Sequence, residues 1–287
     1  DTLFLAYTGY DEYPISASDR GDYLILVEGL VYNIPVSQVQ RELGDLAEAL
    51  ATGQSILTKA RNWILGADGD YLVLMLDRAR NQLFFFNDAL GRLPLYCYRN
   101  DDLFLLSREV KFLTGLKSTV AYDRQAIAEY LLFGYILGDK TLVKGISRLS
   151  GATIGRVDLT SVEADCFKLH GFNLDERRHR GKPLERLAGE LKEVFVATCR
   201  DMSAACGDLK QVVSLSGGLD SRSVAAGMRQ VDSGVSAVTF QDDGADAAIA
   251  EQVAATLDID WRLFDLKPFN LADVNRIVQM KDGLNFM

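Results

Sequence analysis

Short apolar runs separated by polar turns dominate the first part of the chain. They occupy residues 22–33 (DYLILVEGLVYN), 70–88 and 94–107. Polar turns at Asp77–Gln82 and Arg99–Asp102 divide the last two runs into apolar arms, which is typical of β-hairpins. This pattern predicts antiparallel strand pairing.

A helical pattern interrupts these strands and then returns later in the chain. Residues 35–53 carry apolar side chains at helical spacing, and residues 123–136 and 183–202 continue the pattern after residue 120. The change of texture near residue 117 predicts two domains: a strand-rich α+β domain over 1–117, and a second domain over 118–287. Asp123 is the expected N-cap of the first helix in the second domain.

From residue 211 onward, apolar strands alternate with helices. Strands separated by helices that are long enough to cross over favour a parallel sheet covered on both faces. In such sheets the ligand site lies beyond the carboxyl ends of the strands. The expected elements are strand 211–215, a helix to about residue 230, strand 235–240, helix 245–257 and strand 261–266.

Charge and cysteine content narrow the functional classes. The net charge is −9 and no basic run could follow a phosphate backbone, which argues against a nucleic-acid partner. The four cysteines show no metal spacing and are expected to be reduced thiols in a cytoplasmic protein. The first ten residues resemble neither a signal peptide nor a membrane anchor, so no membrane partner is expected.

The string SGGLDS after the first parallel strand carries the main candidate chemistry. Gly217 and Gly218 let backbone N–H groups approach a ligand, and the following helix directs its positive dipole end to the same point. Ser216 and Ser221 add hydroxyl donors for phosphate oxygens. Asp220 would repel a bare phosphate, so it is interpreted as a ligand to magnesium beside a polyphosphate.

These residues also allow simpler interpretations. Two glycines can make a tight turn, and Asp220 can merely cap the helix, but the full string at a strand end favours the binding site. A serine hydrolase is disfavoured, because the only histidines, His170 and His179, lie in or near a charged link and no GxSxG string occurs. Arg222 either reaches a phosphate or lies on the helix surface.

Several segments resemble the asparagine synthetase family. LSGGLDS at residues 215–221 resembles the pyrophosphate-binding loop (PP-loop) of ATP pyrophosphatases, and residues 128–158 resemble the start of the family's synthetase domain. Residues 87–99 and 105–113 resemble the end of its glutamine amidotransferase domain. Residues 27–43 occupy the place of that domain's Asn-Gly-Glu-Ile-Tyr-Asn string. Together these pieces cover most of the chain.

The resemblance implies a fold and an activity. It implies an antiparallel amidotransferase-like domain of the Ntn type, followed by an α/β parallel-sheet ATP pyrophosphatase domain of the adenine nucleotide alpha hydrolase-like class. The implied ligase uses ATP and Mg²⁺ to convert a small-molecule carboxylate to an acyl-adenylate, with release of pyrophosphate. Ammonia or an amine then displaces AMP and forms an amide bond.

The resemblance also implies site residues in the second domain. Ser216, Gly217, Gly218, Asp220 and Ser221 would hold the ATP phosphates, with Asp220 as a metal ligand. Main-chain groups of Val238, Thr239 and Phe240 would surround the adenine, although ordinary strand residues fit the same pattern. Asp242, Asp243 and Asp246 follow that strand, and either form a solvated loop or touch metal or substrate.

The first domain departs from the family pattern. The family's nucleophile is an amino-terminal cysteine that uses its own α-amino group as base, whereas this chain starts with Asp1 and its first cysteine is Cys97. Glu28 stands before Gly29 where the family has an oxyanion-hole asparagine, and a carboxylate would repel the developing oxyanion. Either the chain given is clipped at its start or the glutaminase activity has been lost, and Glu28, which clipping cannot explain, favours the second. We therefore expect no catalytic residues and no glutaminase activity in this domain.

The family's second acidic string, Asp-Gly-Gly-Asp-Glu, is absent from this chain, so we expect the intact protein to be longer at its carboxyl end and also at its amino end. The family also includes enzymes that close β-lactam or peptide rings, and this intramolecular activity stays open. So does a non-catalytic nucleotide-binding or interaction module. A homodimer is compatible with each alternative.

Overall fold

The computed structural model describes residues 3–7, 12–51, 56–117, 119–175, 177–241, 246–266 and 270–280. The chain divides into two compact units, Asp1–Phe172 and Asn173–Met287. No helix in the described ranges is long and apolar enough to cross a membrane.

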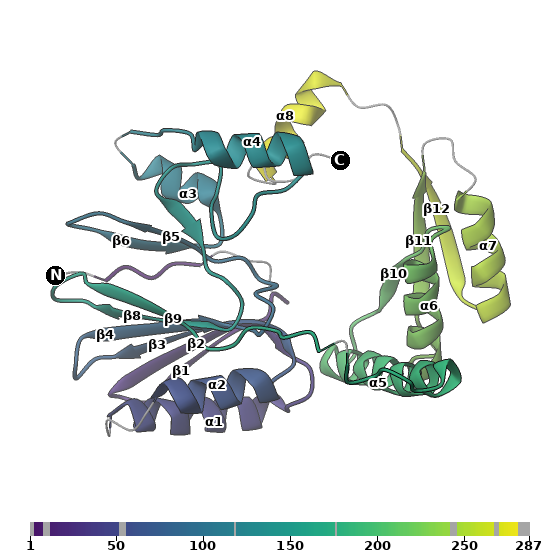
Figure 1. Ribbon diagram of the computed structural model, residues 1–287, viewed down its shortest axis with the longest axis horizontal. Helices are drawn as coiled ribbons and strands as arrows, with labels where there is room; N and C mark the ends of the chain where they lie inside the picture. Colours follow the sequence, from purple (N-terminus) through teal and green to yellow (C-terminus); the bar gives the residue numbers. More distant parts are fainter. Residues whose placement is uncertain are drawn as a thin grey trace. The chain divides into compact units, whose positions relative to one another are not determined.

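The first unit is built on a six-stranded antiparallel sheet in the order β1-β2-β3-β4-β8-β9 (Figure 1). A second, three-stranded sheet has the order β6-β5-β7. The strands of both sheets are β1 (Ile15–Asp19), β2 (Tyr23–Val31), β3 (Gly69–Asp77), β4 (Gln82–Asn87), β5 (Tyr96–Arg99), β6 (Phe104–Ser107), β7 (Ile146–Arg148), β8 (Thr153–Asp158) and β9 (Ala164–Lys168). The predicted hairpins are confirmed as β3–β4 and β5–β6.

The large sheet of this unit is buried on both faces. On β4, Phe84 and Phe86 point into the core beneath helices α1 (Val36–Ala51) and α2 (Ile56–Gly66). Phe85, between them, points into a second core with residues of β5 and β6. Because successive strand residues face opposite sides, a strand between two apolar layers is apolar throughout.

Helices α3 (Val110–Gly115) and α4 (Arg124–Phe133) complete the first unit. Asp123 caps α4 as predicted, because its carboxylate accepts hydrogen bonds from the backbone N–H groups of Gln125 and Ala126.

The boundary between the compact units differs from the predicted division at residue 117. β8 pairs with β4, β9 pairs with β8, and β7 pairs with β5. The segment 119–172 therefore supplies β8 and β9 to the six-stranded sheet of the first unit and β7 to its three-stranded sheet. The helical pattern expected after residue 120 does not extend over 146–168, where three strands lie instead.

The second unit contains the predicted alternation of strands and helices. Strands β10, β11 and β12 form a parallel sheet in that order, with Val213, Ala237 and Trp261 in register. Its elements are α5 (Leu184–Ala205), β10 (Val212–Ser214), α6 (Leu219–Val231), β11 (Ser236–Gln241), α7 (Asp246–Leu257), β12 (Asp260–Asp265) and α8 (Leu271–Met280).

Only one face of this parallel sheet carries a core in the described part of the chain, which corrects the expectation of two covered faces. Val213 and Ala237 face the core that contains residues of α6 and α7, whereas Val212, Phe240 and Phe264 on the other face are 53%, 56% and 46% exposed. The strands follow one another in a single direction across the sheet. Right-handed connections therefore place α6 and α7 on the same side.

Candidate functional site

The glycine loop, residues 215–221, lies at the carboxyl end of β10 and leads into α6. Leu215 is buried, and its N–H donates to the Val238 carbonyl at 2.8 Å, so the loop starts from the sheet. Gly218 is the N-cap of α6 and has extended backbone angles without a side-chain cap. The sequence prediction of a strand, a glycine turn and a helix start is thus confirmed.

The two serines of the loop contact each other. The Ser216 N–H donates to Ser221 Oγ at 3.0 Å, and the two hydroxyl oxygens lie 2.9 Å apart. The Gly218 N–H donates to Ser216 Oγ at 3.2 Å. These hydroxyls therefore hold the loop closed on itself in this structure.

Backbone amides at the start of α6 are the available donors. The N–H groups of Leu219, Asp220 and Ser221 have no acceptor within the described ranges, as expected for the first turn of a helix. They share the dipole end of a 13-residue helix. An anion at the loop could accept from them directly.

Gly217 and Gly218 differ in how much room there is for a Cβ atom. A Cβ at Gly217 would lie 2.5 Å from Asp246 Oδ1 and 3.3 Å from Ile249 Cδ1, both on the first turn of α7. Among the described residues, a Cβ at Gly218 would come within 4 Å of Ser216 Oγ alone, at 3.4 Å. Gly217 therefore makes room for α7, whereas Gly218 faces open space that a ligand can enter.

Charged side chains flank the loop. Asp220 is exposed on the first turn of α6, and the Arg222 Nε–H donates to the Gly218 carbonyl at 3.2 Å. Arg222 therefore lies against the loop. Asp246 was one of three acidic candidates and is the one that the structure places beside the loop, while Asp242 and Asp243 lie outside the described residues.

The end of β11 borders the same edge of the sheet. Thr239 is buried, donates from Oγ1 to the Leu215 carbonyl at 2.7 Å and accepts from Trp261 Nε1 at 2.8 Å, so its side chain links β11 to the glycine loop and to β12. Phe240 is exposed and stacks on Phe264 with ring centroids 5.4 Å apart. Pairing with β10 ends at Val238, which leaves the backbone edge of the next residues open on that side.

The donor set at the loop fits a magnesium–polyphosphate complex. Within the described ranges no group of three or more His, Cys, Asp or Glu side chains is placed to hold a metal ion. Mg²⁺ commonly takes one or two protein carboxylates, with phosphate oxygens and water as its other ligands. Asp220, beside free amides and an open glycine, meets that requirement.

In the first unit, Glu28 is held by two partners from distant segments. Its Oε1 accepts from the Tyr13 hydroxyl and from Arg108 Nε, the latter at 2.9 Å. Arg108 also donates to the Pro94 carbonyl. Burial, followed by the bond to Glu28, raises the pKa of Tyr13. The negative charge of Glu28, which was expected to repel an oxyanion, is therefore compensated by an ion pair with Arg108.

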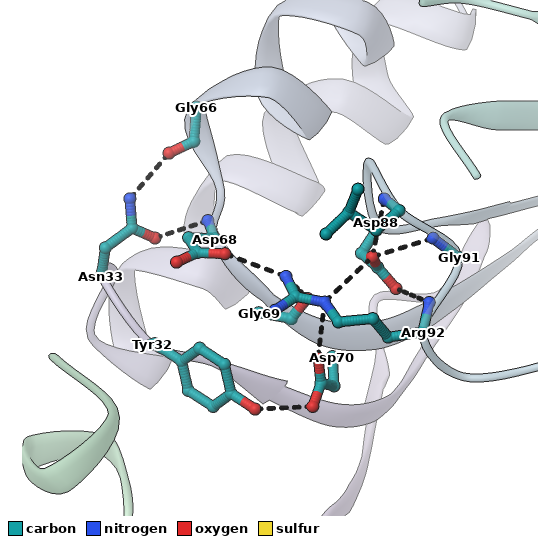
Figure 2. Close-up of polar contacts among 10 residues, drawn as sticks. Tyr32, Asn33, Gly66, Asp68, Gly69, Asp70, Asp88, Gly91 and Arg92 are labelled. Carbon is teal, nitrogen blue, oxygen red and sulfur yellow. Dashed lines mark hydrogen bonds and ion pairs between the residues drawn. The ribbon is translucent and has the colours of Figure 1, made fainter. Parts of the chain in front are cut away.

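A second polar network surrounds Arg92 (Figure 2). Arg92 lies between three carboxylates: Nη2 is 2.9 Å from Asp68, and Nε is 2.7 Å from Asp70 Oδ1 and 3.4 Å from Asp88. Asp70 also accepts from the Tyr32 hydroxyl at 2.8 Å. The Asp70 backbone lies against Gly29. The network therefore joins the start of β3 to the loop after β4.

Sequence patterns missed the contacts of Asp246, Arg108 and Arg92. Most of their partners come from distant segments of the chain, and Glu28 and Arg108 are 80 residues apart. The opposite charges of Glu28 and Arg108 were visible in the sequence, but no periodic pattern joined them.

Comparisons with known proteins agree with the division of the chain into two compact units. A family model described as a glutamine amidotransferase domain matches residues 7–168, and one described as asparagine synthase matches residues 202–287. The chain is 25% identical over 224 residues to the protein named "Putative asparagine synthetase (glutamine-hydrolyzing) 2" of Methanocaldococcus jannaschii. The match covers 74% of this chain and 41% of that protein's length.

Two solved structures share only distant similarity. Glutamine phosphoribosylpyrophosphate amidotransferase from B. subtilis, complexed with ADP and GMP, covers 95% of this chain and 55% of its own, with 11% identity and a TM-score of 0.32. A stage II sporulation E family protein from Thermanaerovibrio acidaminovorans covers 50% of this chain and 78% of its own, with 15% identity and a TM-score of 0.20. Neither score is high enough to carry an argument.

Proposed function

This chain belongs to the asparagine synthetase family, and from that premise we propose that it takes part in ATP-dependent amide-bond formation. The reaction would activate a small-molecule carboxylate at the α-phosphate of ATP, giving an acyl-adenylate and pyrophosphate. An amine or ammonia would then displace AMP. Because the chain spans 41% of the length of its curated relative, this is a proposal for the protein to which the chain belongs.

The observation that carries the proposal is the glycine loop at the carboxyl end of β10. Three amides at the start of α6 that have no acceptor among the described residues, next to Gly218, offer a leaving pyrophosphate prearranged donors. Such donors stabilise charge that develops in the transition state more than charge already present in the ground state. A bound Mg²⁺ would add charge neutralisation between Asp220 and the phosphates.

We propose that the adenine of ATP binds at the end of the neighbouring strand, β11. Thr239 and Phe240 lie on β11 beyond its pairing with β10, and Val238, whose carbonyl accepts from the Leu215 N–H, precedes them. The buried Thr239 side chain is occupied by two hydrogen bonds, so it would act by holding the strand end in place. Phe240 offers the exposed aromatic surface of the three residues.

Free ammonia, or an amine on a second substrate, is the nitrogen source that we propose. The pairing of Glu28 with Arg108 and Tyr13 supports this choice, since the corner that would bind an oxyanion holds a tethered carboxylate instead. An amine within the same substrate would make the enzyme a β-lactam or peptide ring former.

Product analysis separates this reaction from other uses of ATP. The protein is incubated with Mg-ATP, ammonium and a panel of small carboxylates, and nucleotides are separated by ion-exchange chromatography. Carboxylate-dependent formation of AMP and pyrophosphate is the expected result. Formation of ADP and phosphate would contradict an acyl-adenylate. Binding of Mg-ATP with no product from any carboxylate would favour the non-catalytic nucleotide-binding module.

Replacement of Asp220 by alanine is expected to weaken Mg-ATP binding about tenfold, because one charge-assisted contact contributes about 1.5 kcal/mol. Asp220 is exposed at the loop mouth, so the fold should be retained. Titration calorimetry with Mg-ATP measures the effect. Glu251→Ala, which removes an exposed carboxylate from α7, is the control. Equal affinities for the parent and Asp220→Ala would remove Asp220 from the metal site.

A further inference from the structure

Two cysteines of the first unit face one apolar layer from different sheets. Cys97 lies on β5, in the three-stranded sheet, and is half-buried against the core that contains Phe85. Cys166 lies on β9, the edge strand of the six-stranded sheet, and is exposed. Both are free thiols in this structure.

Strand register places the Cys166 side chain on the core side of its sheet. Cys166 pairs with Gly155 of β8, and Gly155 pairs with Phe85 of β4, so the three residues form one row across the sheet. Side chains in such a row point to the same face, and Phe85 points into the core against which Cys97 packs. A Cβ at Gly155 would collide with the Phe85 ring, so this ring extends over Gly155 toward β9.

The three-stranded sheet meets β9 beside this row. Arg99 follows Cys97 by two residues, on the same face of β5, and donates from Nη1 to the Ala164 carbonyl of β9 at 3.4 Å. Ala164 packs against the same core as Cys97 and precedes Cys166 by two residues on one face of β9. β5 and β9 are therefore in contact next to the two thiols.

Electrostatics agree with this placement. Burial, and after it the charge of a Cys166 thiolate, raises the pKa of Cys97 to about 12. Burial, followed by the charge of Asp165, also raises the pKa of Cys166. Both groups are therefore protonated at neutral pH. Cys166 is the exposed one, so it is the thiol that a dissolved oxidant reaches first.

We propose that Cys97 and Cys166 form a disulfide between the two sheets of the first unit when the protein meets a peroxide. Disulfides can span packed sheets, as they do in antibody domains. The bond would fasten β9, an edge strand, to β5. The pair lies in the first unit, so it is independent of the nucleotide site.

The chemistry takes two steps. The Cys166 sulfur attacks the O–O bond of hydrogen peroxide, which gives a sulfenic acid and one molecule of water. The Cys97 sulfur then displaces the hydroxyl group of the sulfenic acid. That hydroxyl leaves as a second water with the Cys97 thiol proton, and the S–S bond forms. The two thiols together lose two electrons and two protons, and the peroxide is reduced to two waters.

The other two cysteines offer no equivalent pair. Cys199 lies in α5 and Cys206 is its C-cap. Seven residues along a helix separate their Cα atoms by about 10 Å, whereas a disulfide requires about 4.4–6.8 Å. The competing explanation for Cys97 and Cys166 is that they are merely small residues of the core, in which case each would oxidise without the other.

Peptide mapping tests the bond. The reduced parent chain is treated with hydrogen peroxide, blocked with iodoacetamide and digested with trypsin without reducing agent. We expect a disulfide between peptides 93–99 and 157–168 that dithiothreitol removes. Cys97→Ser should lack this product and carry a sulfenic acid on Cys166, which dimedone added during oxidation would label. Cys206→Ser is the control and should match the parent.

Two results would overturn the proposal. One is a parent chain in which Cys166 becomes a sulfenic or sulfinic acid without a bond to Cys97. The other is a bond from Cys166 to a second chain, which a non-reducing gel shows as a dimer.

Melting curves test whether the bond fits the folded sheets. Oxidation should raise the Tm of the parent by about 5 °C, because the bond closes a loop of about 70 residues in the unfolded chain. The Tm of Cys97→Ser should not rise on oxidation. An equal or lower Tm for the oxidised parent would mean that the bond forms only in opened chains, which contradicts a pair held ready between packed sheets.

Discussion

Replacement of Gly29 by alanine is expected to destabilise the first unit by about 3 kcal/mol or more. Gly29 has φ +96°, a conformation that costs other residues roughly 1–2 kcal/mol. A Cβ there would also collide with the carbonyl of Asp70 and approach Leu93 Cδ1 to 2.9 Å. Overpacking against a backbone atom adds about 1–3 kcal/mol, because β2 and β3 cannot separate without losing ladder hydrogen bonds.

Tryptophan fluorescence can follow this unit separately. The chain has two tryptophans, Trp63 in α2 and Trp261 in β12, so a Trp261→Phe background reports urea unfolding of the first unit alone. Gly21→Ala is the matched control: Gly21 also has positive φ, at +76°, but a Cβ there would contact nothing within 4 Å. Equal losses for the two variants would show that the collision with Asp70 does not matter.

Replacement of Asp88 by alanine is expected to cost about 3 kcal/mol in the same unit. Asp88 is fully buried and accepts hydrogen bonds from the backbone N–H groups of Leu90, Gly91 and Arg92 at 2.9, 3.0 and 2.9 Å (Figure 2). Its removal would take the acceptor from the N–H groups of Leu90 and Arg92, whereas the Gly91 N–H would keep the Asp88 backbone carbonyl at 3.2 Å. Each unmade bond to a charged acceptor costs about 1.5 kcal/mol or more.

Asp88→Asn provides the graded comparison. An asparagine oxygen can still accept from Leu90 and Gly91, but its NH₂ group cannot accept from Arg92, so about half of the loss is expected. Urea unfolding in the Trp261→Phe background gives both values. A loss below about 1 kcal/mol for Asp88→Ala would contradict the role assigned to this carboxylate.

Local patterns predicted much of the fold. The two hairpins were predictable because their polar turns and apolar arms are adjacent in sequence. The alternation of strands and helices after residue 211 was predictable for the same reason. Strands β7 and β8 were not, because they pair with β5 and β4 from an earlier part of the chain, and β9 pairs in turn with β8. The boundary between the two compact units therefore falls near residue 172 of the chain and not at residue 117.

The sequence by itself determined that a glycine loop joins a parallel strand to a helix, because seven consecutive residues carry the strand end, the turn and the helix start. It likewise placed a glutamate before Gly29. Only the tertiary structure decided that Asp246 touches the glycine loop and that Arg108 neutralises Glu28. Those contacts depend on how helices and strands pack, and packing brings together residues that no local pattern connects.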